Sequence, residues 1–531
     1  MMEFGIILAM RKIYVRSFFP VFLAAMQFGA PFSDNAVLQR GMQVPIWGKA
    51  SPGETVTVEF AGQKHRTVSD GNGRWRVDFA PMPASKIGRT LTANGLSVSN
   101  VVVGEVWFAS GQSNMECPII NPGKPRYRDA KGSLMVSMTH LPFVRFVKTP
   151  RVARPDSAPA DIKAVWRTFE PASFGSCGTF SLSATAFYYA RELYLALDVP
   201  IGIVDSSWGG SQIDAWTPRW AYENCPPELK PVAEYPVTFP WKPENRRHPI
   251  VGEEHQPCVL WNGMVSAFAP MAMRGGIWSQ GCSNCREADV YALKLRTMYD
   301  AWRSAFENRD MSFYIVQLAS FRYWHDKYKY IMAAQERFVR GERNAAIVVT
   351  ADIGNLHDVH YADKETVAQR LAAIALKRNY AFPIPEVESP VLEHVEFTNG
   401  VARMTFGHAK QFYVYAQHFY DDPNFEVAGE DGAWHPAKLQ NVEAVNGLNA
   451  GMVAGGNVLS VRSAKVPHPV RVRYLDDNDA VGTVFNEANL PLGYFEVGEP
   501  FEERSKLGVV AWSTVRDPFL NYMSRGSTEA S

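Results

Sequence analysis

Residues 101–116 decide the fold, and they read VVVGEVWFASGQSNME. The first nine, from Val101 to Ala109, form an apolar run rich in β-branched side chains, which is typical of a parallel strand buried on both faces. This strand leads into the turn Ser110 to Glu116, which places a serine hydroxyl beside glycine and free backbone N–H groups. Because ligands bind at the carboxyl ends of strands in open α/β sheets, this turn is the first candidate site.

Similar apolar runs follow downstream, and each leads into a polar loop: 200–204, 275–278, 313–318 and 346–350. Apolar residues recur at helical spacing within 181–197 and 366–378, which predicts a helix in each range. Alternating strands and helices predict a parallel sheet wrapped by helices. We therefore assign residues 104–383 to one α/β domain.

The sequence pattern on both sides of this domain is typical of antiparallel β-strands. Short alternating runs separated by turn sequences such as Asp70-Gly71-Asn72-Gly73 predict a β-sandwich module at residues 31–103. β-branched and aromatic runs return later, and they predict a second β-sandwich module at residues 384–500. The tail, 501–531, receives no assignment.

Two proline-rich stretches interrupt the α/β domain, at residues 118–175 and 222–257. Connections of this length are typical of loops that shape a substrate site, although plain surface insertions fit equally well. We treat both stretches as insertions.

Composition excludes several classes of protein. The chain has 531 residues, with 54 Lys+Arg against 54 Asp+Glu, 46% hydrophobic and 20% charged residues. This balance excludes wholesale disorder, and zero net charge argues against a nucleic-acid binder, which needs clustered excess Lys and Arg. No stretch is long and apolar enough for a membrane-spanning helix, which needs about 20 such residues.

The N-terminus and the cysteines bear on the cellular compartment. Basic residues, a short apolar run and then small residues predict a secretory signal peptide in residues 1–30 and a secreted or periplasmic protein. A buried N-terminal segment is the alternative.

Six cysteines permit disulfides after export, and their pairing stays open. Cys282 and Cys285 form a C-x-x-C pair without a second pair at ligand spacing, so we expect no metal site.

Four polar blocks, each at the end of an expected strand, carry the candidate chemistry. They cover residues 110–116, 205–211, 278–284 and 352–360. Each block alone has an ordinary explanation as a turn or surface loop. Together they supply a nucleophile, oxyanion donors, a base and a carboxylate, which is the set that serine-dependent acyl transfer requires.

These blocks resemble the sialate O-acetylesterase family, a member of the SGNH (GDSL-like) hydrolase superfamily. The matching motifs are SGQSNME at 110–116, SSWGGS at 206–211, WSQGCSN at 278–284 and DVH at 358–360. The likeness runs in the same order from about residue 31 to 500. It implies an SGNH-type three-layer α/β/α hydrolase domain with a parallel sheet, flanked by the two β-sandwich modules.

The resemblance implies a role for each matching residue. Ser113 would be the nucleophile, His360 the general base and Asp358 the carboxylate that orients it. The backbone N–H groups of Ser113 and Gly210 would bind the oxyanion, with a side-chain amide from Gln280 or Asn284 as a further donor. We favour Gln280, because it lies at the strand end. His357 is a rival for the base, although His360 fits the motif.

Two departures from the family pattern concern the site. Cys282 stands where the family usually has a glutamate, so either Asp358 alone supplies the acid or activity is reduced. The Cys282 thiol could pair with Cys285, and a reading with Cys282 as the nucleophile is weaker because no base accompanies it. Tyr361 replaces the usual proline after the histidine.

The sequence therefore predicts an exported serine esterase that removes O-acetyl groups from carbohydrate without a cofactor or metal. The substrate is an acetylated sialic acid, acetylated xylan or another plant polysaccharide, and a decayed carbohydrate-binding protein is the alternative from another class. We expect substrate contacts from Gln112, Trp208, Gln212 and Trp278, within a wider set of candidate stacking rings and carboxylate-binding arginines: Trp216, Trp324, Arg219, Arg274 and Arg286. Neither a nucleic-acid partner nor a membrane span is expected, and the oligomeric state stays open.

Overall fold

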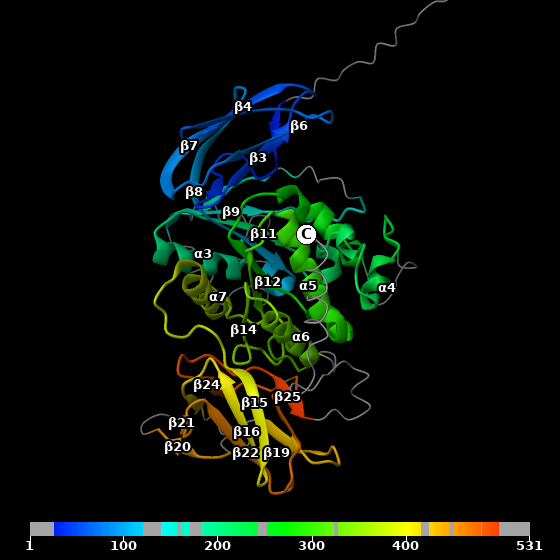
Figure 1. Ribbon diagram of the computed structural model, residues 1–531, viewed down its shortest axis with the longest axis vertical. Coiled ribbons are helices and arrows are strands. Elements are labelled where there is room, and N and C mark those ends of the chain that lie inside the picture. Colours follow the sequence, from blue (N-terminus) through cyan, green and yellow to red (C-terminus); the bar gives the residue numbers. More distant parts are fainter. Residues whose placement is uncertain are drawn as a thin grey trace, which may run out of the picture.

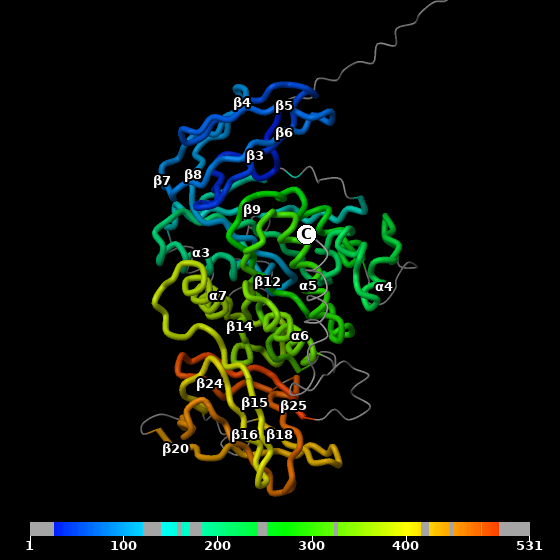
Figure 2. The backbone as a smooth tube through the Cα atoms, viewed as in Figure 1, coloured from blue at the N-terminus to red at the C-terminus, as the bar shows by residue number. Residues whose placement is uncertain are grey.

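The computed structural model describes residues 26–119, 140–156, 162, 164–169, 182–242, 252–322, 328–415, 424–445, 450–478 and 480–498. Three parts follow one another along the long axis of the molecule: N-terminal strands, a central sheet with helices, and C-terminal strands (Figure 1). The backbone trace passes through these parts in chain order (Figure 2). The chain is thus a mixed α/β protein with a β module on each side, as the sequence predicts.

The central sheet has the strand order β10-β9-β11-β8-β12-β13-β14. Neighbouring strands are parallel except β10, which is antiparallel to β9. The bounds are β8 Leu96–Gly111, β9 Leu141–Lys148, β10 Arg167–Phe169, β11 Ile201–Ser207, β12 Gly275–Ser279, β13 Ser312–Val316 and β14 Ala345–Val348. The chain adds strands first on one side of β8 and then on the other, so β8 is a topological switch point, where ligands bind at the carboxyl edge.

Helices cover both faces of this sheet. The longer helices are α3 Ala184–Leu197, α5 Ala288–Ala305, α6 Tyr328–Arg340 and α7 Lys364–Tyr380, and the short ones are α1 Ser113–Glu116 and α4 Lys230–Ala233. Successive side chains of β8 point to opposite faces. Trp107 contacts Tyr189 of α3 with ring centroids 5.3 Å apart, whereas Phe108 contacts Trp302 of α5 at the same separation.

The two predicted helices begin where a side chain caps them. Ser183 Oγ accepts a hydrogen bond from the N–H of Ala186 at 3.1 Å, so α3 starts just after it. Asp363 accepts one from the N–H of Thr366 at 3.0 Å and caps α7. Such caps satisfy backbone donors that the first helical turn leaves unpaired.

Strand β8 belongs to two sheets at once. Its first half, before Glu105, pairs with β2 and β7, and its second half pairs with β11 and β12. The remaining N-terminal strands are β1 Gln27–Phe28, β2 Val37–Gln39, β3 Val44–Lys49, β4 Thr55–Phe60, β5 Gln63–Val68, β6 Arg74–Phe79 and β7 Ser85–Ala93. The expected boundary between 103 and 104 therefore lies within one continuous strand. β1 pairs with β3, so the folded module also begins before residue 31.

A buried carboxylate ties this junction together. Glu105 is fully buried, and it accepts hydrogen bonds from Gln39 at 2.9 Å, Arg40 at 2.5 Å and Arg274 at 3.1 Å. Burial alone would raise the pKa of Glu105, but the hydrogen bonds and charges of Arg274 and Arg40 lower it overall. The ionised carboxylate thus links the N-terminal module to the central sheet.

The stretch 118–175 is more than an inserted loop, because it contains β9, which pairs with β11 in the central sheet. The sequence pattern does not predict this strand. Pro142 lies near its start, and Arg145 points inward, where it donates hydrogen bonds to the backbone carbonyls of Asn35 at 3.0 Å and Asn100 at 2.5 Å. Burial lowers the pKa of Arg145 to about 10. A proline and a buried arginine are uncommon in a central strand.

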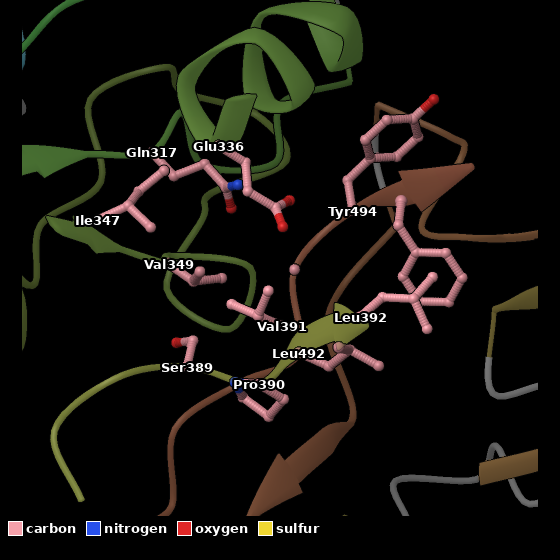
Figure 3. A pocket seen from close by; sticks show the side chains of 12 residues that line it. Gln317, Glu336, Ile347, Val349, Ser389, Pro390, Val391, Leu392, Leu492 and Tyr494 are labelled. Carbon is pink, nitrogen blue, oxygen red and sulfur yellow. The ribbon is translucent and has the colours of Figure 1, made fainter. Parts of the chain in front are cut away.

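The C-terminal strands form antiparallel sheets of seven and four strands. Their bounds are β15 Val391–Thr398, β16 Val401–Gly407, β17 Phe412–Tyr415, β18 Phe425–Ala428, β19 Trp434–Leu439, β20 Val442–Ala444, β21 Ala450–Val453, β22 Val458–Arg462, β23 Arg471–Tyr474, β24 Val484–Asn486 and β25 Phe495–Gly498. A small cavity lies where this module meets the central sheet, between Gln317, Glu336, Val391 and Tyr494 (Figure 3). None of the catalytic candidates lines it.

Within the described ranges, no helix combines the length and apolar character needed to cross a bilayer. The same residues contain no group of three or more His, Cys, Asp or Glu arranged to hold a metal ion.

Candidate active site

The serine turn lies at the carboxyl edge of the sheet. Gly111 has φ +133°, and a Cβ added there would lie 2.2 Å from the carbonyl oxygen of Ser279 in the neighbouring strand, so only glycine fits. The N–H of Gln112 donates to that same carbonyl at 2.9 Å. Ser113 then begins α1 and stays partly exposed. The strand thus ends in a tight turn that presents Ser113 at the edge of the sheet.

Parallel register brings the first three blocks together. Gly111 in β8 pairs with Ser207 in β11 on one side and with Ser279 in β12 on the other. The loops that follow these three residues therefore begin side by side at the carboxyl edge of the sheet. This placement is what the sequence predicted from three separate apolar runs.

The loop after β11 contacts the serine turn through its glycines. A Cβ added at Gly209 would lie 3.5 Å from Ser113 Cβ. Gly210 has φ +79°, and its carbonyl accepts a hydrogen bond from Ser283 Oγ at 2.6 Å. Among the described residues, the N–H of Gly210 has no hydrogen-bond partner. A partly exposed, unpaired N–H beside a serine is what an oxyanion donor requires.

The histidine loop follows β14. His360 Nδ1 lies 3.2 Å from Asp358 Oδ1, and the same oxygen accepts the backbone N–H of His360 at 2.9 Å. Burial lowers the pKa of His360, the charge of Asp358 raises it and the charge of Lys364 lowers it, with a net lowering. The imidazole is therefore neutral near pH 7, as a general base must be. His357, the rival candidate, is exposed.

Asn114 brings the histidine loop to the serine turn. Its Nδ2 donates to the carbonyl of Val359 at 3.0 Å, and its Oδ1 accepts from Lys364 Nζ at 2.6 Å. Ser113 and His360 are the chain neighbours of Asn114 and Val359, so this contact places the nucleophile and base candidates in adjoining segments. Lys364 is fully buried and lies over the ring of Tyr361.

The side-chain amides of Gln280 and Asn284, the candidate oxyanion donors, already donate hydrogen bonds to other groups. Gln280 Nε2 donates to the carbonyl of Ser211 at 3.1 Å and to Asn284 Oδ1 at 2.7 Å. Asn284 Nδ2 donates to Glu287 Oε2 at 2.8 Å, and Glu287 in turn pairs with buried Lys294. Both amides are buried. Gln280 thus bonds to the loop after Gly210 with both of its amide N–H bonds occupied, and Asn284 has one of its two N–H bonds occupied by Glu287.

Among the predicted substrate contacts, Trp208 is the ring that stays partly exposed, with the Arg151 guanidinium 5.8 Å from its centroid. Trp278 is fully buried against Trp216 and Trp302, which is at odds with its predicted contact to substrate. The interior of a folded protein is close-packed, so a sugar cannot reach this ring.

The other predicted contacts divide between buried and surface positions. Gln112 and Gln212 are buried and bonded to the third block, at the Gly281 N–H and the Ser283 carbonyl. Trp324 lies outside the described residues. The arginines considered as carboxylate ligands have other environments: Arg219 donates to the carbonyl of Ala233, Arg274 to Glu105, and Arg286 is exposed.

Cys282 has the character of a packing residue. It is buried, its Sγ lies 3.8 Å from the hydroxyl of Tyr328, and burial raises its pKa to about 11. Cys282 and Cys285 do not form a disulfide with each other. A thiol with this pKa is almost wholly protonated near pH 7, so Cys282 is a poor nucleophile.

Three residues at the site have no role in the sequence-based prediction. Glu116 lies in the first block, but its sequence position does not reveal its contacts with the Gly209 N–H and with Arg151. Arg151 comes from the stretch 118–175 and has no motif around it. His255 reaches the site from the other insertion, with its Nε2 3.6 Å from a Cβ added at Gly210.

Comparisons with known proteins agree with the motifs. A model of the family described as carbohydrate esterase, sialic acid-specific acetylesterase, matches residues 255–377. Sialate O-acetylesterase of Mus musculus is 26% identical over 503 residues, covering 83% of this chain and 90% of the mouse protein. The Homo sapiens enzyme is 24% identical over 482 residues, covering 83% of this chain and 88% of the human protein.

One solved structure extends the likeness to three dimensions. A carbohydrate acetylesterase from Xanthomonas citri matches with a TM-score of 0.74 and 26% identity, covering 90% of this chain and 100% of that chain. The resemblance that the sequence motifs predicted is therefore confirmed.

Proposed function

We propose that this chain, a relative of the sialate O-acetylesterases, is a serine esterase that removes O-acetyl groups from carbohydrates. One observation carries the proposal: a Ser113 turn, an unpaired Gly210 N–H and a His360–Asp358 pair belong to adjoining loops at one edge of a parallel sheet. Each group fits one task of acyl transfer, and the relatives are named for this activity.

The proposed reaction has two halves. Ser113 Oγ attacks the acetyl carbonyl carbon while His360 takes its proton, and the N–H groups of Gly210 and Ser113 bind the resulting oxyanion. The bond to the sugar oxygen then breaks, and His360 returns the proton to that oxygen. In the second half, water attacks the acetyl-serine with His360 as base, and acetate leaves as the proton returns to Ser113.

The finer features follow the same resemblance. We place the helix-covered parallel sheet in the SGNH-type three-layer class, because alternate side chains of β8 contact helices on opposite faces. Export rests on the pattern of residues 1–30. Sequencing the N-terminus of the protein recovered outside the cytoplasm tests it, and a chain that still starts at Met1 contradicts it.

Acetate release from O-acetylated sialic acid and from acetylated xylan, measured side by side, tests the function. Ser113→Ala should lower kcat by more than about 10³-fold on whichever substrate is cleaved. Ser304→Ala, at the exposed far end of α5, is the matched control and should keep full activity. Release that survives Ser113→Ala refutes the mechanism. A folded wild-type protein that binds both sugars without releasing acetate favours the carbohydrate-binding alternative.

A further inference from the structure

Glu116 holds the glycine loop that carries the candidate oxyanion donor. Its side chain is almost fully buried, and its Oε2 accepts a hydrogen bond from the N–H of Gly209 at 2.8 Å. Its other oxygen accepts two hydrogen bonds from Arg151, from Nε at 2.7 Å and from Nη2. A carboxylate held by a guanidinium fork is a fixed acceptor, because the fork restricts its rotation.

The peptide group that follows Gly210 is held by a second side chain. Ser283 Oγ donates to the carbonyl of Gly210 at 2.6 Å. Glu116 therefore fixes the N–H before Gly210, and Ser283 fixes the carbonyl after it. With both neighbours bonded, the N–H of Gly210 keeps one direction and has no partner among the described residues.

The packing around Gly209 shows how closely this carboxylate approaches. A Cβ added at Gly209 would lie 2.9 Å from Glu116 Oε2, closer than side-chain carbons normally come. Residue 209 therefore has to be glycine if the carboxylate is to reach the backbone. Glycine here also makes the loop flexible, so an external restraint is needed to hold one conformation.

We propose that Glu116 is a positioning residue for catalysis: it clamps the Gly209 N–H so that the Gly210 N–H points at the oxyanion. Arg151 orients the carboxylate through its two hydrogen bonds, and Ser283 provides the second point of the clamp. The inference rests on the proposed function, since it assigns a role within that same site. Preorganised donors stabilise a transition state because they need no reorientation during the reaction.

The test compares Glu116→Gln and Glu116→Ala with a matched control. Glutamine keeps an acceptor oxygen but loses the charge, so kcat should fall about 10-fold, whereas alanine removes the clamp and should lower kcat about 10²-fold. KM should stay within about twofold in both, because the ground-state ester does not need the oxyanion donor. Glu307→Gln makes the same chemical change in a surface carboxylate that accepts hydrogen bonds from Arg76, away from the candidate site, and it should leave activity unchanged.

A second readout separates positioning from a general structural defect. Methylboronic acid forms a tetrahedral adduct with an active serine, whose oxygen would occupy the oxyanion site, whereas acetate binds as a ground-state product. In the Glu116 variants, inhibition by methylboronic acid should weaken in proportion to the loss of kcat/KM, and inhibition by acetate should not change. Ser283→Ala should show the same pattern with a smaller loss, and it carries the test if the Glu116 variants do not fold.

The outcomes are distinct. Unchanged kcat in Glu116→Ala overturns the inference, and so does a fall in kcat without weaker boronate inhibition. If Ser113→Ala keeps activity, the proposed function itself fails, whatever the Glu116 variants show.

Discussion

Adding one methyl group at Gly209 should slow the enzyme without unfolding it. The new Cβ would lie 2.9 Å from Glu116 Oε2 and 3.5 Å from Ser113 Cβ. Since ordinary contact begins near 3.4 Å, the carboxylate must retreat by about half an ångström, which lengthens its 2.8 Å bond with the residue 209 N–H to about 3.3 Å and weakens it. A hydrogen bond to a charged group contributes about 1.5–3 kcal/mol.

If that bond positions the oxyanion donor, kcat for Gly209→Ala should fall about 10- to 100-fold while KM changes little. Acetate release measured by pH-stat across a substrate series gives both constants, and thermal melting shows whether the fold survives. Gly53→Ala is the control for inserting alanine at a loop glycine, because nothing lies near a Cβ there, although its φ of +76° costs some stability. A folded Gly209→Ala protein with kcat within twofold of wild type refutes the reasoning.

Three further changes test other parts of the site and its support. Asp358→Asn should lower kcat about 10²- to 10⁴-fold. It should also move the acidic limb of the kcat/KM profile to lower pH, because the charge of Asp358 raises the pKa of His360, whereas burial lowers it. An acidic limb that does not move contradicts this pairing. Asn114→Ala should lower kcat about 10-fold by releasing the Val359 carbonyl, and equal kcat in the two proteins argues against the contact. Glu105→Gln should reduce the free energy of unfolding by about 2–3 kcal/mol in urea at pH 7. Because the pKa of Glu105 is lowered in the fold, its contribution is full above the unfolded value of 4.5 and is lost progressively as the pH falls through the lower folded pKa, so a difference that does not shrink between pH 7 and pH 3 is inconsistent with an ionised pair.

The sequence predicts those strands of the central sheet whose buried positions are all occupied by apolar side chains. The apolar runs ending at Gly111, Ser207 and Ser279 become neighbouring strands in register, so the polar blocks after them converge. It misses β9, because Pro142 and the buried Arg145 break the apolar pattern that marks a buried strand. Here a tertiary contact, from Arg145 to the N-terminal module, overrides the local signal.

The hydrogen bonds and contacts that a side chain makes are harder to predict than the location of its loop. A motif places Gln280 and Asn284 beside the site, but only the packed structure reveals that their amide groups bond to each other and to Glu287. Trp278 illustrates the same limit, since a tryptophan at a strand end is equally compatible with a sugar platform and with a core. The clamp by Glu116 needs Arg151, which lies 35 residues away in a stretch without periodicity.

The shared strand β8 limits how this protein could be assembled from exchangeable parts. A gene fusion that joined foreign segments between residues 103 and 104 would have to match a strand already paired with β2 and β7 upstream and with β11 and β12 downstream. Register errors of a single residue would turn every following side chain to the opposite face. Recombination that replaces the N-terminal module is therefore expected to succeed only when it carries β8 along, so the module and the serine turn should be inherited as a unit.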